Sequence, residues 1–161
     1  RIYTDVDIPY QLSAIDSIIH YLDAEQFDFV TGDRTLTEAS YYAHMPPLRR
    51  VASHVYSTLV SRLIAGERFD TQCGLKGFRA DVAEQLFSAS RVNRFAFDVE
   101  LFCIAREHDM RIKRLPVQLR SQDTSTVKLV SDGLTMLCDL ARIRGNQLRG
   151  VYRTNSQTGW K

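Results

Sequence analysis

The chain has 161 residues, of which 44% are hydrophobic and 25% are charged. This size and composition fit one ordinary globular domain, and the formal net charge of +2 gives no reason to expect a nucleic acid as the main partner. The three cysteines lie far apart and are not matched by nearby histidines, which argues against a disulfide framework or a zinc site and fits a reducing compartment.

Strand and helix patterns alternate in the first half of the chain. Residues 1–4 read as the end of a strand, and we expect that some sequence upstream of them has been removed. Apolar residues at helical spacing predict a helix over about 11–25, and a short apolar run predicts a strand over 27–31. The polar residues 33–44 are typical of a loop. A long helix is expected from the proline pair at 46–47 to about Gly66, because proline is tolerated in a first turn.

The second half is richer in helix. We expect an extended segment over 69–78, a short helix over about 80–87 and a mostly buried helix over 97–108. Residues 112–119 predict a strand, at a sheet edge because Pro116 has no amide proton to donate. A last helix begins at Ser131 or Asp132 and ends at Gly145.

The carboxyl end is basic, since no acidic residue follows Asp139 while five cations do: Arg142, Arg144, Arg149, Arg153 and Lys161. We therefore divide the chain into residues 1–130 and a carboxyl-terminal amphipathic helix with a basic tail, residues 131–161. This helix could lie on an anionic membrane surface or pack on the core, and the pattern does not decide between the two.

Acidic residues occur in two places that could carry chemistry. Asp5-Val6-Asp7 follows a strand, where two carboxylates can converge on a hard divalent cation; a solvated loop with a helix cap explains the same triplet. Asp98 and Glu100 enter an otherwise apolar helix, where acids favour the positive end of the helix dipole. They cannot both serve one cap, and a buried acid needs a partner.

Cations and glycines form the remaining candidates. Gly74 and Gly77 bracket Lys76, so the backbone can approach a ligand closely beside a positive charge, although a hairpin with a surface lysine fits as well. Four further cations could clamp phosphates or could simply be solvated: Arg34, Arg49, Arg50 and Lys128.

Taken in order, these segments resemble the polyprenyl-phosphate glycosyltransferases of glycosyltransferase family 2, and most of all the dolichyl-phosphate β-glucosyltransferases. The resemblance covers almost the whole chain. Its most specific stretches are Asp70-Thr71-Gln72-Cys73-Gly74-Leu75-Lys76 and Phe97-Asp98-Val99-Glu100-Leu101, which add weight to Asp5-Val6-Asp7 and Gly32-Asp33-Arg34.

The resemblance implies an α/β fold, the carboxyl-terminal portion of a GT-A (Rossmann-like) domain, with a mixed sheet flanked by helices. Residues 1–130 would be a catalytic-domain portion starting at the DxD strand, with the amino-terminal nucleotide-binding half missing. The implied reaction is metal-dependent, inverting transfer of a hexose from a nucleotide sugar to a polyprenyl or dolichyl phosphate. The Gln72-Cys73 pair favours UDP-glucose as the donor.

The resemblance also implies a role for each site residue. Asp5 and Asp7 would hold Mg²⁺ or Mn²⁺ against the diphosphate of the nucleotide sugar. Arg34, with Arg49 or Arg50, would receive the lipid phosphate. The sugar and acceptor side would be lined by Asp70, Gln72 and Lys76, while Asp98 orients the site and Glu100 supports it through hydrogen bonds.

By the same resemblance, we expect a peripheral protein at the cytoplasmic face of a membrane. An absent upstream half would leave sheet edge and apolar surface exposed, which favours a homodimer, and would leave the isolated chain inactive. Two alternatives remain open: a non-catalytic module that keeps the fold, and transfer to a saccharide. The saccharide alternative requires a general base, for which Asp70 or Asp98 is available.

Overall fold

The computed structural model describes residues 1–5, 10–36, 47–62, 66, 69–93, 96–117 and 131–153. Strands and helices alternate along the first half of the chain and two helices follow one another in the second half, as the sequence patterns predicted. In chain order they are β1 (Ile2–Thr4), α1 (Ser13–Asp23), β2 (Phe29–Asp33), α3 (Pro47–Val60), β3 (Leu75–Phe78), α4 (Ala80–Ala89), α5 (Phe97–Glu107), β4 (Ile112–Pro116) and α6 (Ser131–Leu148).

The four strands form one mixed sheet in the order β1-β3-β2-β4. β3 is antiparallel to both of its neighbours, whereas β2 and β4 are parallel. The carboxyl ends of β1, β2 and β4 therefore meet the amino end of β3 at one end of the sheet. The α/β class and the mixed sheet are confirmed, and β4 lies at an edge as its proline predicted.

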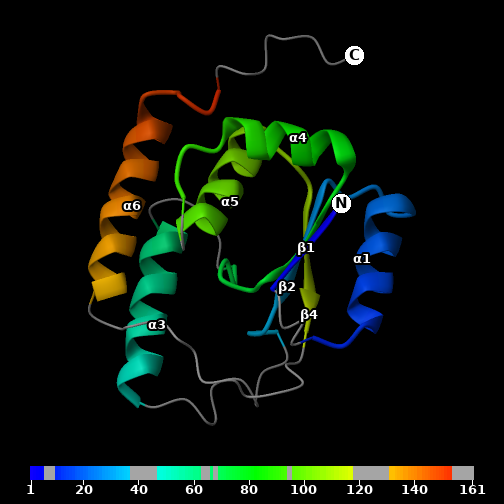
Figure 1. Ribbon diagram of the computed structural model, residues 1–161, viewed down its shortest axis with the longest axis horizontal. Helices are drawn as coiled ribbons and strands as arrows, with labels where there is room; N and C mark the ends of the chain where they lie inside the picture. Colours follow the sequence, from blue (N-terminus) through cyan, green and yellow to red (C-terminus); the bar gives the residue numbers. More distant parts are fainter. Residues whose placement is uncertain are drawn as a thin grey trace.

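Helices cover both faces of this sheet, with α1 on one side and α4 and α5 on the other (Figure 1). On the α1 face, Ile18 packs so closely over Gly77 that a Cβ added there would lie 2.1 Å from the Ile18 Cγ2 atom. On the opposite face, Phe29 stacks on Phe78 with ring centroids 4.6 Å apart and also contacts Phe102 of α5. The sheet is thus the middle layer between two hydrophobic clusters.

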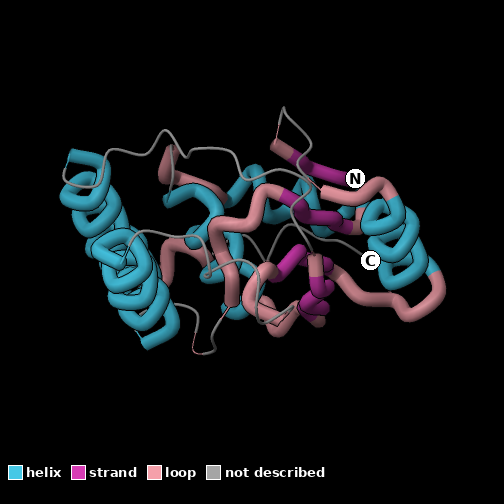
Figure 2. The backbone as a smooth tube through the Cα atoms, turned by 90° about the horizontal axis from the view of Figure 1, so that it is seen from below, coloured by secondary structure: helices cyan, strands magenta, loops and turns pink. Residues whose placement is uncertain are grey.

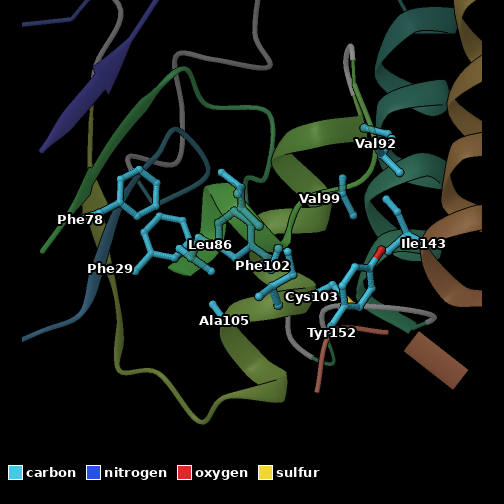
Figure 3. Packing of buried hydrophobic residues seen from close by; sticks show 14 of the residues in the cluster. Phe29, Phe78, Leu86, Val92, Val99, Phe102, Cys103, Ala105, Ile143 and Tyr152 are labelled. Atoms are coloured by element: carbon cyan, nitrogen blue, oxygen red, sulfur yellow. The ribbon is translucent and has the colours of Figure 1, made fainter. Parts of the chain in front are cut away.

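The α4–α5 side is the larger cluster, and α6 extends it (Figure 3). Leu140 and Ile143 of α6 are buried in this cluster together with Tyr152, which follows the helix. Figures 1 and 2 show α3 and α6 beyond α5, at the end of the molecule opposite α1. α6 therefore packs on the core through these residues, one of the two arrangements that its sequence pattern allowed.

Several boundaries differ from the sequence prediction; β4, for example, ends at Pro116 instead of residue 119. β2 starts and ends two residues later than expected, because Asp33 pairs in register with Pro116 of β4. The extended segment 69–78 is a strand only over its last four residues, since the Cys73 amide turns back to the Asp70 carbonyl oxygen. α6 continues through Gly145, and the chain turns instead at Gly150, whose φ is +70°.

Within the described ranges, every helix is too short or too polar to cross a lipid bilayer.

Candidate functional site

The candidate site lies where β1 and β2 end and β3 begins. β1 delivers Asp5, β2 delivers Asp33 and Arg34, and the turn before β3 carries Asp70. Residues separated by two positions share a face of a strand, and so do residues paired across strands. Because Tyr3 pairs with Lys76, these two side chains and that of Asp5 point to the face of the sheet that α5 covers.

Gly74 makes room for the Asp5 carboxylate. The Asp5 amide donates to the Gly74 carbonyl oxygen at 2.9 Å, which extends the β1–β3 ladder by one bond. A Cβ added at Gly74 would lie 1.9 Å from Asp5 Oδ2. Any side chain at position 74 would displace this carboxylate, so the close approach of Asp5 to the β3 backbone depends on glycine here.

Lys76 is fully buried and forms an ion pair with Asp98 of α5. Its Nζ lies 2.9 Å from Asp98 Oδ1 and donates to the Cys73 carbonyl oxygen at 2.5 Å. The same Nζ stands 5.8 Å from the centroid of the Tyr3 ring, within range of a cation–π contact. The lysine therefore joins the β1–β3 pair to α5, and the surface-lysine alternative is excluded.

The acids of the site act on one another. Burial raises the pKa of Asp98, Lys76 opposes that shift, and the charges of Asp5 and Asp70 add to it. The pKa of the Tyr3 hydroxyl is raised by burial and then by Asp98 and Asp5. Negative charge thus exceeds what Lys76 neutralises near Asp5. Asp5 therefore offers a carboxylate of the kind that Mg²⁺ or Mn²⁺ binds, although the described part of the chain contains no group of three or more acidic, histidine or cysteine side chains that could hold a metal ion by itself.

A second charged network lies beside the first. Arg34 binds Asp70 with both ends of its guanidinium, Nε to Oδ2 at 2.6 Å and Nη2 to Oδ1 at 2.8 Å. Arg114 Nε donates to Asp33 Oδ2 at 2.7 Å, and Asp33 Oδ1 accepts from the Thr35 amide. These pairs fasten the end of β2 to β4 and to the turn before β3.

Sequence reasoning included Asp33 in the Gly32-Asp33-Arg34 stretch but gave it no role, and it did not select Arg114. Asp33 is fully buried, and a buried carboxylate must be paired. The sequence did contain a signal for Asp33. This acid directly follows an apolar strand and its glycine, and it cannot be solvated if that strand lies in the middle of the sheet. The arginine that pairs with it could not be identified without the β2–β4 register.

Comparison with known proteins identifies relatives along most of the chain. A dolichyl-phosphate beta-glucosyltransferase of Dictyostelium discoideum is 28% identical over 143 residues, which cover 88% of this chain and 44% of the relative. Proteins with the same name are 32% identical over 128 residues in Homo sapiens (80% of this chain, 40% of the relative) and 34% identical over 115 residues in Trichomonas vaginalis (71% and 35%). Over most of its length the chain is thus similar to the dolichyl-phosphate β-glucosyltransferases, which are members of glycosyltransferase family 2.

The chain spans less than half of the length of these family members. No family model matches the sequence. No solved structure matches it either. The assignment to glycosyltransferase family 2 therefore rests on the curated relatives, and the α/β arrangement described above agrees with it.

The structure brings together most of the residues that the family resemblance selected. Asp5, Lys76 and Asp98 form one cluster, Arg34 and Asp70 form the adjoining pair, and Gln72 is half-buried in the turn between them. Asp7 lies outside the described residues. Arg49 and Arg50 lie at the start of α3, and their side chains are outside the described part of the structure.

Glu100 makes its hydrogen bonds within the protein. Its side chain is fully buried, and both carboxylate oxygens are used within the protein. Oε2 accepts from the Ser90 hydroxyl and from the backbone amides of Arg91 and Val92, while Oε1 accepts from the Tyr152 hydroxyl at 2.6 Å. Glu100 therefore ties the α4–α5 turn and the end of α6 to α5.

Proposed function

We propose that the protein transfers a hexose from a nucleotide sugar to a polyprenyl or dolichyl phosphate, with inversion at the anomeric carbon and with UDP-glucose as the favoured donor. The observation that carries the proposal is the convergence of Asp5, Lys76 and Asp98 beside the Arg34–Asp70 pair at one end of the sheet. In open α/β sheets, ligands bind beyond the carboxyl ends of the strands. The names of the family members support the choice of acceptor.

The electrostatics of the site suit this reaction. The attacking group would be a phosphate oxygen that is already anionic at neutral pH, so no strong general base is required. The remaining difficulty is repulsion between an anionic acceptor and an anionic donor, which fixed positive charge relieves. Arg34 would supply such charge and is held in place by Asp70, while Lys76 and Asp98 fix the β3 backbone beside the reacting groups.

Asp5, together with Asp7, would hold Mg²⁺ or Mn²⁺ through carboxylate oxygens. When bound, such an ion offsets the charge of the leaving diphosphate. Gly74 would keep the Asp5 carboxylate in its place, because no side chain competes for that space.

Arg49 and Arg50 at the start of α3 would add positive charge for the lipid phosphate, since helix starts attract anions. A lipid acceptor implies work at a membrane surface. We propose a peripheral position at the cytoplasmic face, with residues 1–130 as the catalytic portion and residues 131–161 as an added helix and basic tail.

The test is a sugar-transfer assay on the natural gene product, with UDP-glucose, a dolichyl phosphate and Mg²⁺ or Mn²⁺. We expect a lipid-extractable glucose product whose formation stops with a chelator and falls at least about a hundredfold in Asp5→Ala, the scale of losing a group that stabilises the transition state. Leu137→Ala, an exposed change on α6, is the matched control and should keep full activity. A product that forms equally well in chelator would refute the metal-dependent mechanism.

Transfer to a saccharide is the second candidate, because the raised pKa of Asp98 gives the site a carboxyl group suited to a proton acceptor. An assay that offers the enzyme both free oligosaccharides and dolichyl phosphate distinguishes the two candidate acceptors. If glucose is found only on the oligosaccharide, the saccharide replaces the lipid phosphate as the acceptor in our proposal.

A further inference from the structure

Tyr10 lies next to the candidate site without belonging to any motif that the sequence highlighted. Its side chain is only 2% exposed and packs in the cluster on the α1 face with Cys73 and Leu75. Its hydroxyl oxygen accepts a hydrogen bond from the Gly74 amide at 3.0 Å and lies 3.5 Å from the Cys73 Sγ atom. Gly74 is the residue whose missing side chain leaves space for the Asp5 carboxylate.

Gly74 is thus held from both sides by one short segment of chain. Its carbonyl oxygen accepts from the Asp5 amide, and its amide donates to Tyr10. In the sequence, Asp5 and Tyr10 are the two ends of a six-residue stretch that contains Asp7. Both ends of this acidic stretch are therefore fixed to the same backbone residue.

The phenol ring and the hydroxyl of Tyr10 do different things. The ring fills the apolar cluster, which phenylalanine would do equally well. The hydroxyl satisfies the Gly74 amide, which lies just before β3 begins, and a buried amide without a partner is costly. The loss of this hydroxyl would therefore loosen Gly74 and, through it, the position of the Asp5 carboxylate.

We propose that Tyr10 is a positioning residue that fixes the Asp5 carboxylate for a divalent cation by holding the Gly74 backbone. This inference rests on the proposed function, because it assumes that Asp5 binds the cation of the diphosphate donor. It assigns the hydroxyl of Tyr10 to the geometry of the site and only the ring to the stability of the core.

The test measures the binding of Mn²⁺ alone to the Tyr10→Phe variant. The electron paramagnetic resonance signal of the free ion reports how much Mn²⁺ remains unbound. We expect the Mn²⁺ dissociation constant to rise about fivefold, the factor that one net hydrogen bond gives. Tyr152→Phe is the matched control: it also removes a buried, hydrogen-bonded hydroxyl, but from the pair with Glu100 on the far side of α5. It should lower the melting temperature and leave Mn²⁺ affinity unchanged.

A second variant, Gly74→Ala, tests the same geometry from the other side. The added methyl group would overlap the end of the Asp5 side chain, so Mn²⁺ affinity should fall at least as far as in Tyr10→Phe.

Each other result counts against the proposal. Unchanged affinity in Tyr10→Phe, or an equal loss in Tyr152→Phe, would overturn the positioning role while the unaltered chain still binds Mn²⁺. An unaltered chain that binds no Mn²⁺ would overturn the cation site of the proposed function, and the role of Tyr10 with it.

Discussion

Among single residues, Lys76 carries the sharpest energetic consequence. Its ammonium group is fully buried, and its partner Asp98 is 15% exposed. Replacing one member of a buried ion pair leaves the other charge without compensation, which costs about 3 kcal/mol. We expect Lys76→Met to lower the free energy of unfolding by about that amount in urea. In the double variant Lys76→Met/Asp98→Leu, where no charge is stranded, the loss should be smaller; an equal or larger loss would mean that the pair is not the cause.

The effect of Lys76→Met should also depend on pH. The pKa of the Asp98 carboxyl is raised on folding, so the folded state binds this proton more tightly and stability falls as pH rises through that pKa. Lys76 opposes the shift, and its removal raises the pKa further. The difference in unfolding free energy between Lys76→Met and the unaltered chain should therefore be largest at neutral pH. It should shrink in mild acid, where the protonated carboxyl needs no cation.

At the scale of elements, the helices and their buried faces could be predicted because hydrophobic periodicity is local information. The spacing of apolar residues in α1 and α5 was enough to identify both helices. The roles of Asp98 and Glu100 were not predictable, although they lie two residues apart on α5. Asp98 meets Lys76 from the sheet, and Glu100 meets Tyr152 from beyond α6, and neither partner is near in sequence.

The sequence alone also did not show which glycine ends α6. Gly145 was expected to end the helix, yet it lies inside α6, whereas Gly150 has the positive φ of a helix terminator. An added Cβ meets nothing within 4 Å at either position, so the two glycines differ in backbone conformation alone.

This pair allows a controlled prediction on α6. Alanine in a helix interior is more favourable than glycine, so Gly145→Ala should raise the free energy of unfolding by about 0.5–1 kcal/mol. Gly150→Ala places a side chain at φ +70° and should lower it by about 1 kcal/mol. Urea denaturation of each single variant measures its change in the free energy of unfolding. Equal effects at the two positions would show that the φ difference does not matter.

At the scale of the whole molecule, the three cysteines report on the two clusters around the sheet. Cys73 is buried on the α1 face and Cys103 is buried among α4, α5 and α6, whereas Cys138 is exposed on α6. Burial raises the pKa of Cys73 and raises that of Cys103 to about 12, so at neutral pH both remain thiols, which react slowly.

We therefore expect one thiol of three to react quickly with a disulfide reagent in the native state. Cys138→Ser should abolish this fast phase without changing the slow one. If the sheet joins its two clusters into one cooperative unit, Cys73 and Cys103 should react together, at a rate that rises with urea as global unfolding does. Mapping the labelled peptides in samples taken at successive times would distinguish the reaction of Cys73 from that of Cys103. If Cys73 reacted well before Cys103, the α1 face, and with it the contact of Tyr10 with Gly74, would open independently of the larger cluster.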